Sequence, residues 1–123
     1  MAEGRVTQIS AVTLAVADMA RSVGFYRSLG FEVLYGGDDA PFTSLRAGTG
    51  FVNLQLVAGA GPFDGAWGRA ILWVDDVDAV HDRAVAAGLR PEMAPSDAPW
   101  GERYFHLRDP DGHELSFARR LTP

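Results

Sequence analysis

The feature that most restricts how this chain can fold is an internal repeat. Shifting the sequence by 58 positions aligns two apolar strand positions, an aspartate suited to capping a helix and a glycine suited to ending one. The matched pairs are Leu14 with Leu72, Val16 with Val74, Asp18 with Asp76, and Gly30 with Gly88. Apolar matches alone are common by chance, but here the cap and the stop recur in the same order. The repeat therefore indicates two copies of one structural unit.

The first copy covers about residues 8–57, and its predicted element order is β-α-β-β-β. Residues 11–16 form a short apolar run with β-branched members, which is typical of a strand. A helix follows, from its cap at Asp18 to its stop at Gly30. The remaining strands are predicted at 31–37, 42–47 and 51–57, with a turn at 48–50 joining the last two.

The second copy, at about residues 69–120, repeats this order after a connection at 58–68 that contains glycine and proline. The predicted elements are a strand at 69–74, a helix from the Asp76 cap to Gly88, strands at 89–94, 103–108 and 113–119, and a turn DPDG at 109–112. A chain of 123 residues is long enough to bury one core. We therefore expect a single α+β domain over residues 1–123, built from two tandem βαβββ modules whose curved sheets surround a pocket.

Each predicted sheet has one face under its helix and one free face. On the first strand, Val12, Leu14 and Val16 are expected under the helix, which turns Ala11 and Thr13 to the free face. The same alternation assigns further residues to the free faces: Phe51, Asn53, Gln55, Arg69, Ile71, Trp73, Phe105, Glu114, Ser116 and Ala118. Polar and aromatic side chains mixed in this way are typical of the lining of a ligand cavity.

Charge and composition exclude several classes of partner. Sixteen acidic and eleven basic side chains give a net charge of −5, which disfavours nucleic acid and favours a cationic small molecule. The chain has no run of the roughly 18 apolar residues that a membrane span needs, and its N-terminal residues show no signal pattern. A cytoplasmic protein without a membrane partner is expected. Because cysteine is absent, only histidine and carboxylate side chains remain as strong metal ligands.

Two segments of the chain resemble a known family. The opening VTLAVADMARSVGFYRSLGFEV at 12–33 and the closing PWGERYFHLRDPDGHELSF at 99–117 are similar to the vicinal-oxygen-chelate superfamily. This superfamily contains glyoxalases, extradiol dioxygenases, fosfomycin-inactivating transferases and bleomycin-resistance proteins. The likeness covers nearly the whole chain, and the closing segment is particularly like bleomycin-binding proteins of about this length.

The resemblance also implies where a catalytic metal would be held. The family's four ligand positions fall on Ala11, Gln55, Arg69 and Ser116, and the repeat pairs Ala11 with Arg69 and Gln55 with Ser116. Alanine has no donor atom, arginine repels a cation, and the glutamine and serine oxygens are neutral and weak ligands. We therefore expect neither a metal nor another cofactor.

The histidines do not indicate a catalytic centre. His106 follows Glu102 on a predicted strand and His113 precedes Glu114, so either pair would suit acid-base chemistry. His113 comes directly after the DPDG turn, where an exposed polar residue is expected, and His81 is expected on the surface of the second helix. No catalytic residue is assigned.

Aromatic side chains at the free faces and their rims suit a flat conjugated ligand. Glu114 is expected either to pair with Arg69 or Arg103 or to meet a cationic group of the ligand, and Arg69 is expected to meet a carboxylate or phenolate oxygen. The candidate ligand-binding residues are Phe51, Asn53, Gln55, Trp67, Arg69, Trp73, Trp100, Arg103, Phe105, Glu114 and Ser116.

The favoured hypothesis is a metal-free protein that sequesters an aromatic or peptide-like natural product and so gives drug or antibiotic resistance, as bleomycin-resistance proteins do. The resemblance also implies a homodimer with pockets at the subunit interface, whose modules pair or exchange strands between copies. One alternative is a metal-independent isomerase or cyclase of the same fold. Another is a metal-dependent enzyme like the glyoxalases or dioxygenases, with ligands drawn from Glu102, His106, His113 or Glu114.

Overall fold

The computed structural model describes residues 3–63 and 67–122 and contains two βαβββ modules in tandem. The first module consists of β1 (Ala11–Val16), α1 (Met19–Ser28), β2 (Val33–Tyr35), β3 (Phe42–Ala47) and β4 (Gly50–Leu56). The second consists of β5 (Arg69–Trp73), α2 (Val77–Ala86), β6 (Ser96–Asp97), β7 (Glu102–Arg108) and β8 (Glu114–Arg120). The predicted α+β architecture with a repeated module is confirmed.

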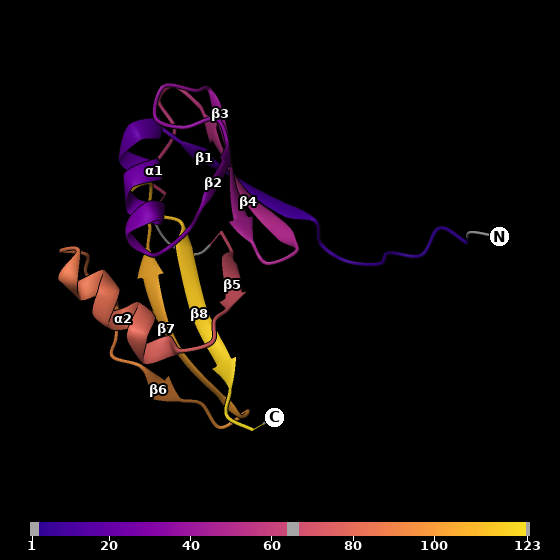
Figure 1. The fold of residues 1–123 in the computed structure, drawn as a ribbon, viewed down its shortest axis with the longest axis vertical. Coiled ribbons are helices and arrows are strands. Elements are labelled where there is room, and N and C mark those ends of the chain that lie inside the picture. The colour runs from indigo at the N-terminus through magenta and orange to yellow at the C-terminus, as the bar shows by residue number, and fades with distance from the viewer. Residues whose placement is uncertain (1–2, 64–66, 123) are drawn as a thin grey trace.

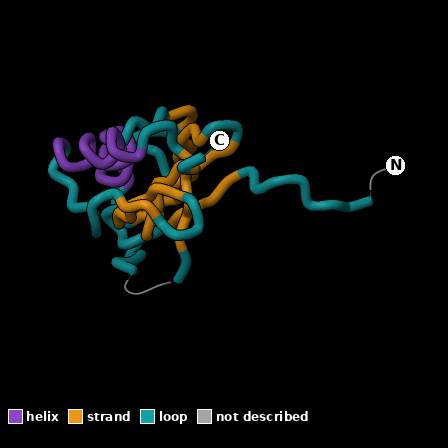
Figure 2. Tube along the Cα trace, turned by 90° about the horizontal axis from the view of Figure 1, so that it is seen from below, coloured by secondary structure: helices purple, strands orange, loops and turns teal. Residues whose placement is uncertain are grey.

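The two modules form separate four-stranded sheets with the same topology. The strand orders are β1-β4-β3-β2 and β5-β8-β7-β6, and in each sheet the first strand runs parallel to the last strand of its module. One sheet lies above the other, each with its own helix, and both helices lie together on one side of the molecule (Figures 1 and 2). Within one chain the two sheets are not closed around a common pocket.

Both helices start where the sequence predicts. The Asp18 carboxylate accepts a hydrogen bond from the backbone N–H of Arg21 at 3.0 Å, and the Asp76 carboxylate accepts one from Ala79 at 3.0 Å. Each cap therefore satisfies an amide that has no partner within the helix. Gly30 and Gly88 follow the helix ends with φ of +96° and +80°, a left-handed conformation that side chains with a Cβ adopt with difficulty. No helix in the described ranges is long and apolar enough to cross a membrane.

Two predicted strands differ from the structure. The strand predicted at 31–37 is limited to Val33–Tyr35, and the strand predicted at 89–94 is replaced by the two-residue β6 at Ser96–Asp97. Pro91 and Pro95 lie in or beside the second segment, and proline cannot donate a hydrogen bond to a neighbouring strand. Both strands lie at a sheet edge, where short pairing is common.

One predicted free-face residue belongs instead to the core. Phe105 is fully buried, is paired with Phe117 in the β7–β8 ladder and stacks on its ring with centroids 5.3 Å apart. The prediction for Phe105 is wrong. Alternation shows that neighbouring residues of a strand point to opposite faces, but pairing with β8 decides which of them point to the core. His81 on α2 packs its ring edge against Phe105 at 5.1 Å and is half-buried, not a solvated surface residue.

The turn at 109–112 joins the second module to the first. The Asp111 carboxylate accepts hydrogen bonds from the Ala17 amide at 2.9 Å, from Arg21 at 3.1 Å and from the Ser22 hydroxyl at 3.1 Å. Asp109 accepts one from the Tyr26 hydroxyl at 2.8 Å, and burial raises the pKa of both Asp109 and Tyr26. The turn therefore places two buried carboxylates in hydrogen-bonding contact with the start and middle of α1.

His113 belongs to the same junction and is not exposed as predicted. Only 3% of its surface is accessible, and its Nε2 lies 2.7 Å from the Ala15 carbonyl oxygen of the first module. The rings of Phe63 and Trp67 lie against it, with centroids 4.7 and 5.5 Å away. The His113 side chain, just before β8, therefore contacts the first module, which the sequence pattern alone does not reveal.

Replacing Asp111 with alanine should lower the free energy of unfolding by about 3 kcal/mol, because the Ala17 amide and the Ser22 hydroxyl would lose a buried acceptor. Urea denaturation followed by circular dichroism measures the change. Asp82→Ala, at an exposed position of α2, is the control and should change the free energy by less than about 0.5 kcal/mol. Equal effects of the two substitutions would show that Asp111 does not hold the modules together.

Candidate functional site

The free face of the second sheet is organised in rows across its three long strands. In the register of β5, β8 and β7, the residues opposite one another belong to the same face. The first row contains Arg69, Glu114 and Arg108; the second contains Ile71, Ser116 and His106; the third contains Trp73, Ala118 and Tyr104. In the second and third rows the central strand contributes the small, buried side chains Ser116 and Ala118, and the outer strands contribute larger ones.

The first row and its neighbour Glu92 form a network of charged side chains. Arg69 donates from Nε to Glu114 Oε1 at 2.7 Å, and its second nitrogen lies 2.6 Å from the same oxygen. Arg108 donates from Nε to Glu92 Oε1 at 3.0 Å and from a terminal nitrogen to the Gly112 carbonyl at 2.7 Å. Glu114 is mostly buried, so its ion pair with Arg69 is screened less than a surface pair. The structure thus brings together the predicted pair Arg69 and Glu114.

The carboxyl groups of Glu92 and Glu114 shift each other's pKa in opposite directions. A hydrogen bond between the two carboxyl groups, followed by burial, raises the pKa of Glu92, and the same hydrogen bond lowers the pKa of Glu114. Glu114 is the one that stays ionised because Arg69 pairs with it. Burial, followed by the charge of Arg69, lowers the pKa of His106, so its imidazole is neutral at pH 7.

Aromatic side chains continue from His106 along β7. The Tyr104 ring lies 5.1 Å from the His106 ring, and the Trp100 ring lies 5.9 Å from Tyr104. On the other side of the sheet's central strand, Trp73 has 57% of its surface exposed and receives the Arg120 guanidinium over its ring at 5.2 Å. Exposed aromatic rings of this size are the groups that gain most when a ligand covers them.

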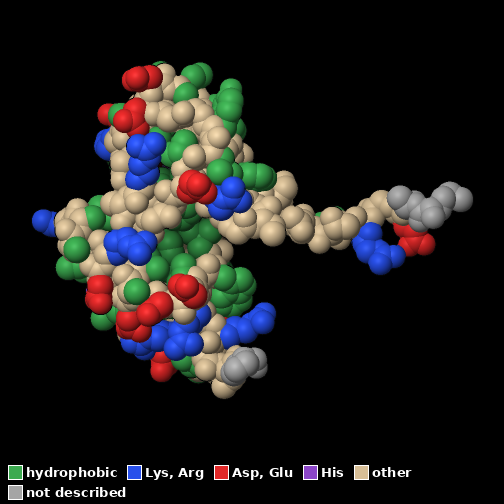
Figure 3. Space-filling model, viewed as in Figure 1, with side chains coloured by type: hydrophobic (Ala, Val, Ile, Leu, Met, Phe, Trp, Pro, Cys, Tyr) green, Lys and Arg blue, Asp and Glu red, His purple; other side chains and the backbone are tan. Residues whose placement is uncertain are grey.

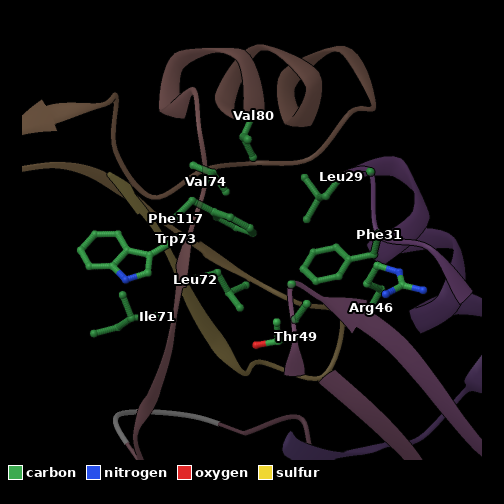
Figure 4. Close-up of a pocket in the computed structure, with 13 residues that line it drawn as sticks. Leu29, Phe31, Arg46, Thr49, Ile71, Leu72, Trp73, Val74, Val80 and Phe117 are labelled. Carbon is green, nitrogen blue, oxygen red and sulfur yellow. The ribbon is translucent and has the colours of Figure 1, made fainter. Parts of the chain in front are cut away.

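Two clefts lie where the modules meet, on either side of β5. The larger has a volume of about 520 Å³ and is formed by the end of α1, the β3–β4 turn, β5 and α2. Figure 4 shows Leu29 and Phe31 facing Leu72 and Val80 across this cleft, with Trp73 on the opposite side of β5. In the space-filling view, hydrophobic side chains gather at this junction (Figure 3).

The smaller cleft, of about 420 Å³, contains residues of the N-terminal segment and of both free faces. Ile9, Phe51, Arg69 and Ile71 contribute to its wall. It therefore connects the free face of the first sheet to the charged row of the second. A cleft between modules with apolar walls and a few polar groups is a common location for a ligand.

The other predicted site residues occupy different surroundings. On the first sheet, Phe51 and Gln55 are exposed, and Asn53 accepts from Ser44 at 2.8 Å and donates to Thr13 at 3.4 Å. Trp67 and Trp100 are exposed, and Ser116 is buried beneath its larger neighbours.

Arg103 is not near Glu114. It lies on the helix-facing side of β7 together with Phe105, where it is paired with Asp78 and Asp97 at 2.8 Å. The expected pairing of Arg103 with Glu114 is therefore wrong, since consecutive strand residues point to opposite faces.

Sequence reasoning missed Glu92 and Arg108 and gave little weight to His106. Glu92 lies outside any strand, and its position is determined by a hydrogen bond from its amide to the His106 carbonyl at 2.9 Å. No periodicity predicts such a contact. His106 and Arg108 alternate with the buried Phe105 and Leu107, and that pattern would have placed them on the free face.

The family's metal positions do not fit a metal ion. Ala11 offers no ligand, and the Arg69 guanidinium occupies its position with a positive charge held by Glu114. Gln55 and Ser116 are left with neutral oxygens, which bind divalent cations weakly compared with imidazole or carboxylate. No step that depends on a metal at these four positions follows from this chain.

The fold defines a small α+β protein with two repeated modules whose sheets are not closed around a pocket within one chain. The chain belongs to the glyoxalase/bleomycin resistance protein/dioxygenase superfamily, whose family model matches residues 8–117. No curated protein matches the chain.

Solved structures show the same fold. TioX from Micromonospora sp. ML1 is 31% identical, with a TM-score of 0.73 and coverage of 94% of this chain and 100% of that one. A bleomycin-binding protein complexed with bleomycin is 24% identical, with a TM-score of 0.74 and coverage of 94% and 99%. A lactoylglutathione lyase from Agrobacterium tumefaciens is 20% identical, with a TM-score of 0.73 and coverage of 92% and 93%. The fold is thus shared by a binding protein and an enzyme.

The raised pKa of Glu92 predicts a measurable pH dependence. The folded protein binds this proton more tightly than the unfolded chain, whose glutamate has a pKa of 4.5. The contribution of Glu92 to the free energy of unfolding should therefore rise as the pH falls from above the pKa of Glu92 in the folded protein towards 4.5. Replacing Glu114 with glutamine should lower the pKa of Glu92, as measured by NMR titration of the side-chain carboxyl carbons. An unchanged pKa of Glu92 in this variant would show that Glu114 does not raise it.

Proposed function

We propose that this protein binds and sequesters an aromatic or peptide-like natural product without a metal ion, and so protects against a drug or antibiotic. The observation that supports this most directly is the Arg69–Glu114 ion pair, which occupies a family metal position and lies beside exposed aromatic rings. Protection would come from occupancy of the site.

The proposed ligand lies on the free faces and against the rings at their rims. Burying an exposed aromatic ring contributes several kcal/mol from its area, and stacking adds roughly 1 kcal/mol. Polar groups in the first row would orient the ligand, since each can form a charge-assisted hydrogen bond. The proposed binding residues are Phe51, Asn53, Gln55, Trp67, Arg69, Trp73, Trp100, Glu114 and Ser116.

A second copy of the chain completes the proposed site. Residues 3–10 extend away from the body in two views, with Val6 88% and Ile9 78% exposed (Figures 1 and 2). Apolar side chains on such an arm are stabilised when another surface covers them. Because the two sheets of one chain are not closed, a homodimer with pockets at the subunit interface would both cover the arm and enclose the ligand.

Sequestration predicts tight binding without turnover. A panel of planar aromatic and peptide-like antibiotics that includes bleomycin should contain a compound that quenches the tryptophan fluorescence of the protein. Trp73→Ala should weaken that binding about tenfold because a stacking surface is lost. Val85→Ala, at an exposed position on α2, is the control and should leave it unchanged. A panel with no binding compound would contradict the proposal.

A metal-independent isomerase or cyclase is the second candidate, and the Glu92–Glu114 pair beside neutral His106 favours it. These groups can exchange a proton with a ligand, and Arg69 can stabilise a developing anion. Mass spectrometry of a bound compound after incubation separates the two functions. A product that forms with the native protein and not with Glu114→Gln would establish the enzyme, whereas unchanged compound supports sequestration.

Substitution of the exposed apolar residues in the N-terminal segment 3–10 tests the proposed dimer. The double substitution Val6→Ser and Ile9→Ser should shift the protein from dimer to monomer, because it removes the apolar contacts that we expect the partner to bury. Light scattering after size-exclusion chromatography measures the mass. Thr7→Ser with Gln8→Ser changes the same arm without removing apolar surface and should remain dimeric. A native protein that is already monomeric would contradict the proposed assembly.

A further inference from the structure

Three acceptor atoms converge on the free face of the second sheet. His106 Nδ1 lies 3.9 Å from Glu92 Oε2 and 4.0 Å from Glu114 Oε2, and one ligand atom from each residue lies within 4.8 Å of the others. We call these three atoms the acceptor triad. They come from β7, from β8 and from the segment between α2 and β6, so only the fold brings them together.

The neighbouring arginines bind the other oxygen of each carboxylate. Arg69 is hydrogen-bonded to Glu114 Oε1, and Arg108 to Glu92 Oε1. A terminal nitrogen of Arg108 lies 3.8 Å from Glu114 Oε2, which is longer than a hydrogen bond. The two guanidinium groups thus orient the carboxylates, while Oε2 of each faces the imidazole.

We infer that the acceptor triad binds a primary ammonium group on an aromatic ligand, an inference that rests on the proposed binding function. An ammonium group has three N–H donors and no acceptor, which matches three convergent acceptors. With hydrogen bonds of about 2.8 Å and tetrahedral directions, its acceptors lie roughly 4.6 Å apart. Ligands of a tetrahedral zinc ion at about 2.1 Å would lie roughly 3.4 Å apart. The observed separations of 3.9 and 4.0 Å lie between these two values, so the spacing fits either ion and the neighbouring charges favour the ammonium group.

Charge balance supports a monovalent cation. The triad and its arginines comprise two carboxylates, two guanidinium groups and an imidazole. With a neutral imidazole these charges cancel, so an ammonium ion brings one positive charge, whereas a divalent ion would bring two beside Arg69 and Arg108. The neutral His106 ring accepts at Nδ1 when its proton is on Nε2.

The rings beside the triad indicate where the rest of the ligand lies. Tyr104 is 5.1 Å from the His106 ring and leads to Trp100, while Trp73 is exposed on the other side of β8. A flat ring with an amine on a short linker would place its charge on the triad and its ring against these aromatic side chains.

Three naphthalenes with the same ring test the inference by isothermal titration calorimetry: 2-(aminomethyl)naphthalene, 2-naphthalenemethanol and 2-naphthoate. The amine should bind at least about tenfold more tightly than the alcohol because its hydrogen bonds are charge-assisted, and the naphthoate should bind most weakly. Glu92→Gln should reduce the affinity for the amine to that for the alcohol.

Glu32→Gln is the matched control, since Glu32 also pairs with an arginine, Arg46, but belongs to the first module. It should leave the amine affinity unchanged. Equal binding of the amine and the alcohol would overturn the ammonium site while leaving the proposed binding of aromatic rings in place. No binding of any naphthalene would overturn the site, and the antibiotic panel would then decide the proposed function. Stoichiometric binding of zinc chloride that Glu92→Gln abolishes would identify the triad as a metal site instead.

Discussion

The interaction on which the rest of the structure depends is the contact of the turn at 109–112 with α1. Asp109 and Asp111 are buried there, and together they accept hydrogen bonds from a helix hydroxyl, a tyrosine, an arginine and a backbone amide of the first module. Charged groups are buried only where such partners exist. This contact joins two otherwise separate sheets, so it determines the clefts on either side of β5 and the directions in which the free faces point.

The free face of the second sheet contains a linked group of charged side chains. Arg69 needs an anion nearby, which Glu114 supplies from the neighbouring strand. Glu114 in turn raises the pKa of Glu92, first through the hydrogen bond between the carboxyl groups and then, after burial, through the repulsion of its negative charge. The result is a group of charged side chains that can bind an organic ligand or exchange a proton with it.

Prediction succeeded where local chemistry is sufficient. The repeat, both aspartate caps, both glycine stops and the order of elements follow from short-range hydrogen bonding and from the alternation of apolar residues. Prediction failed where one segment depends on another. Phe105 was assigned to the wrong face, because its pairing with Phe117 of β8 decides which face it occupies. Glu92 was not predicted as a site residue, because a backbone hydrogen bond from a loop to β7 determines its position.

By itself, the sequence determined the two modules and the family resemblance, because these depend on which residues stand at fixed spacings. Only the tertiary structure decided that His113 is buried between modules and that Glu92, His106 and Glu114 converge. Those three residues are separated in the chain and meet through strand pairing and a backbone hydrogen bond. Contacts of this kind are set by packing across the whole domain, which no local pattern records.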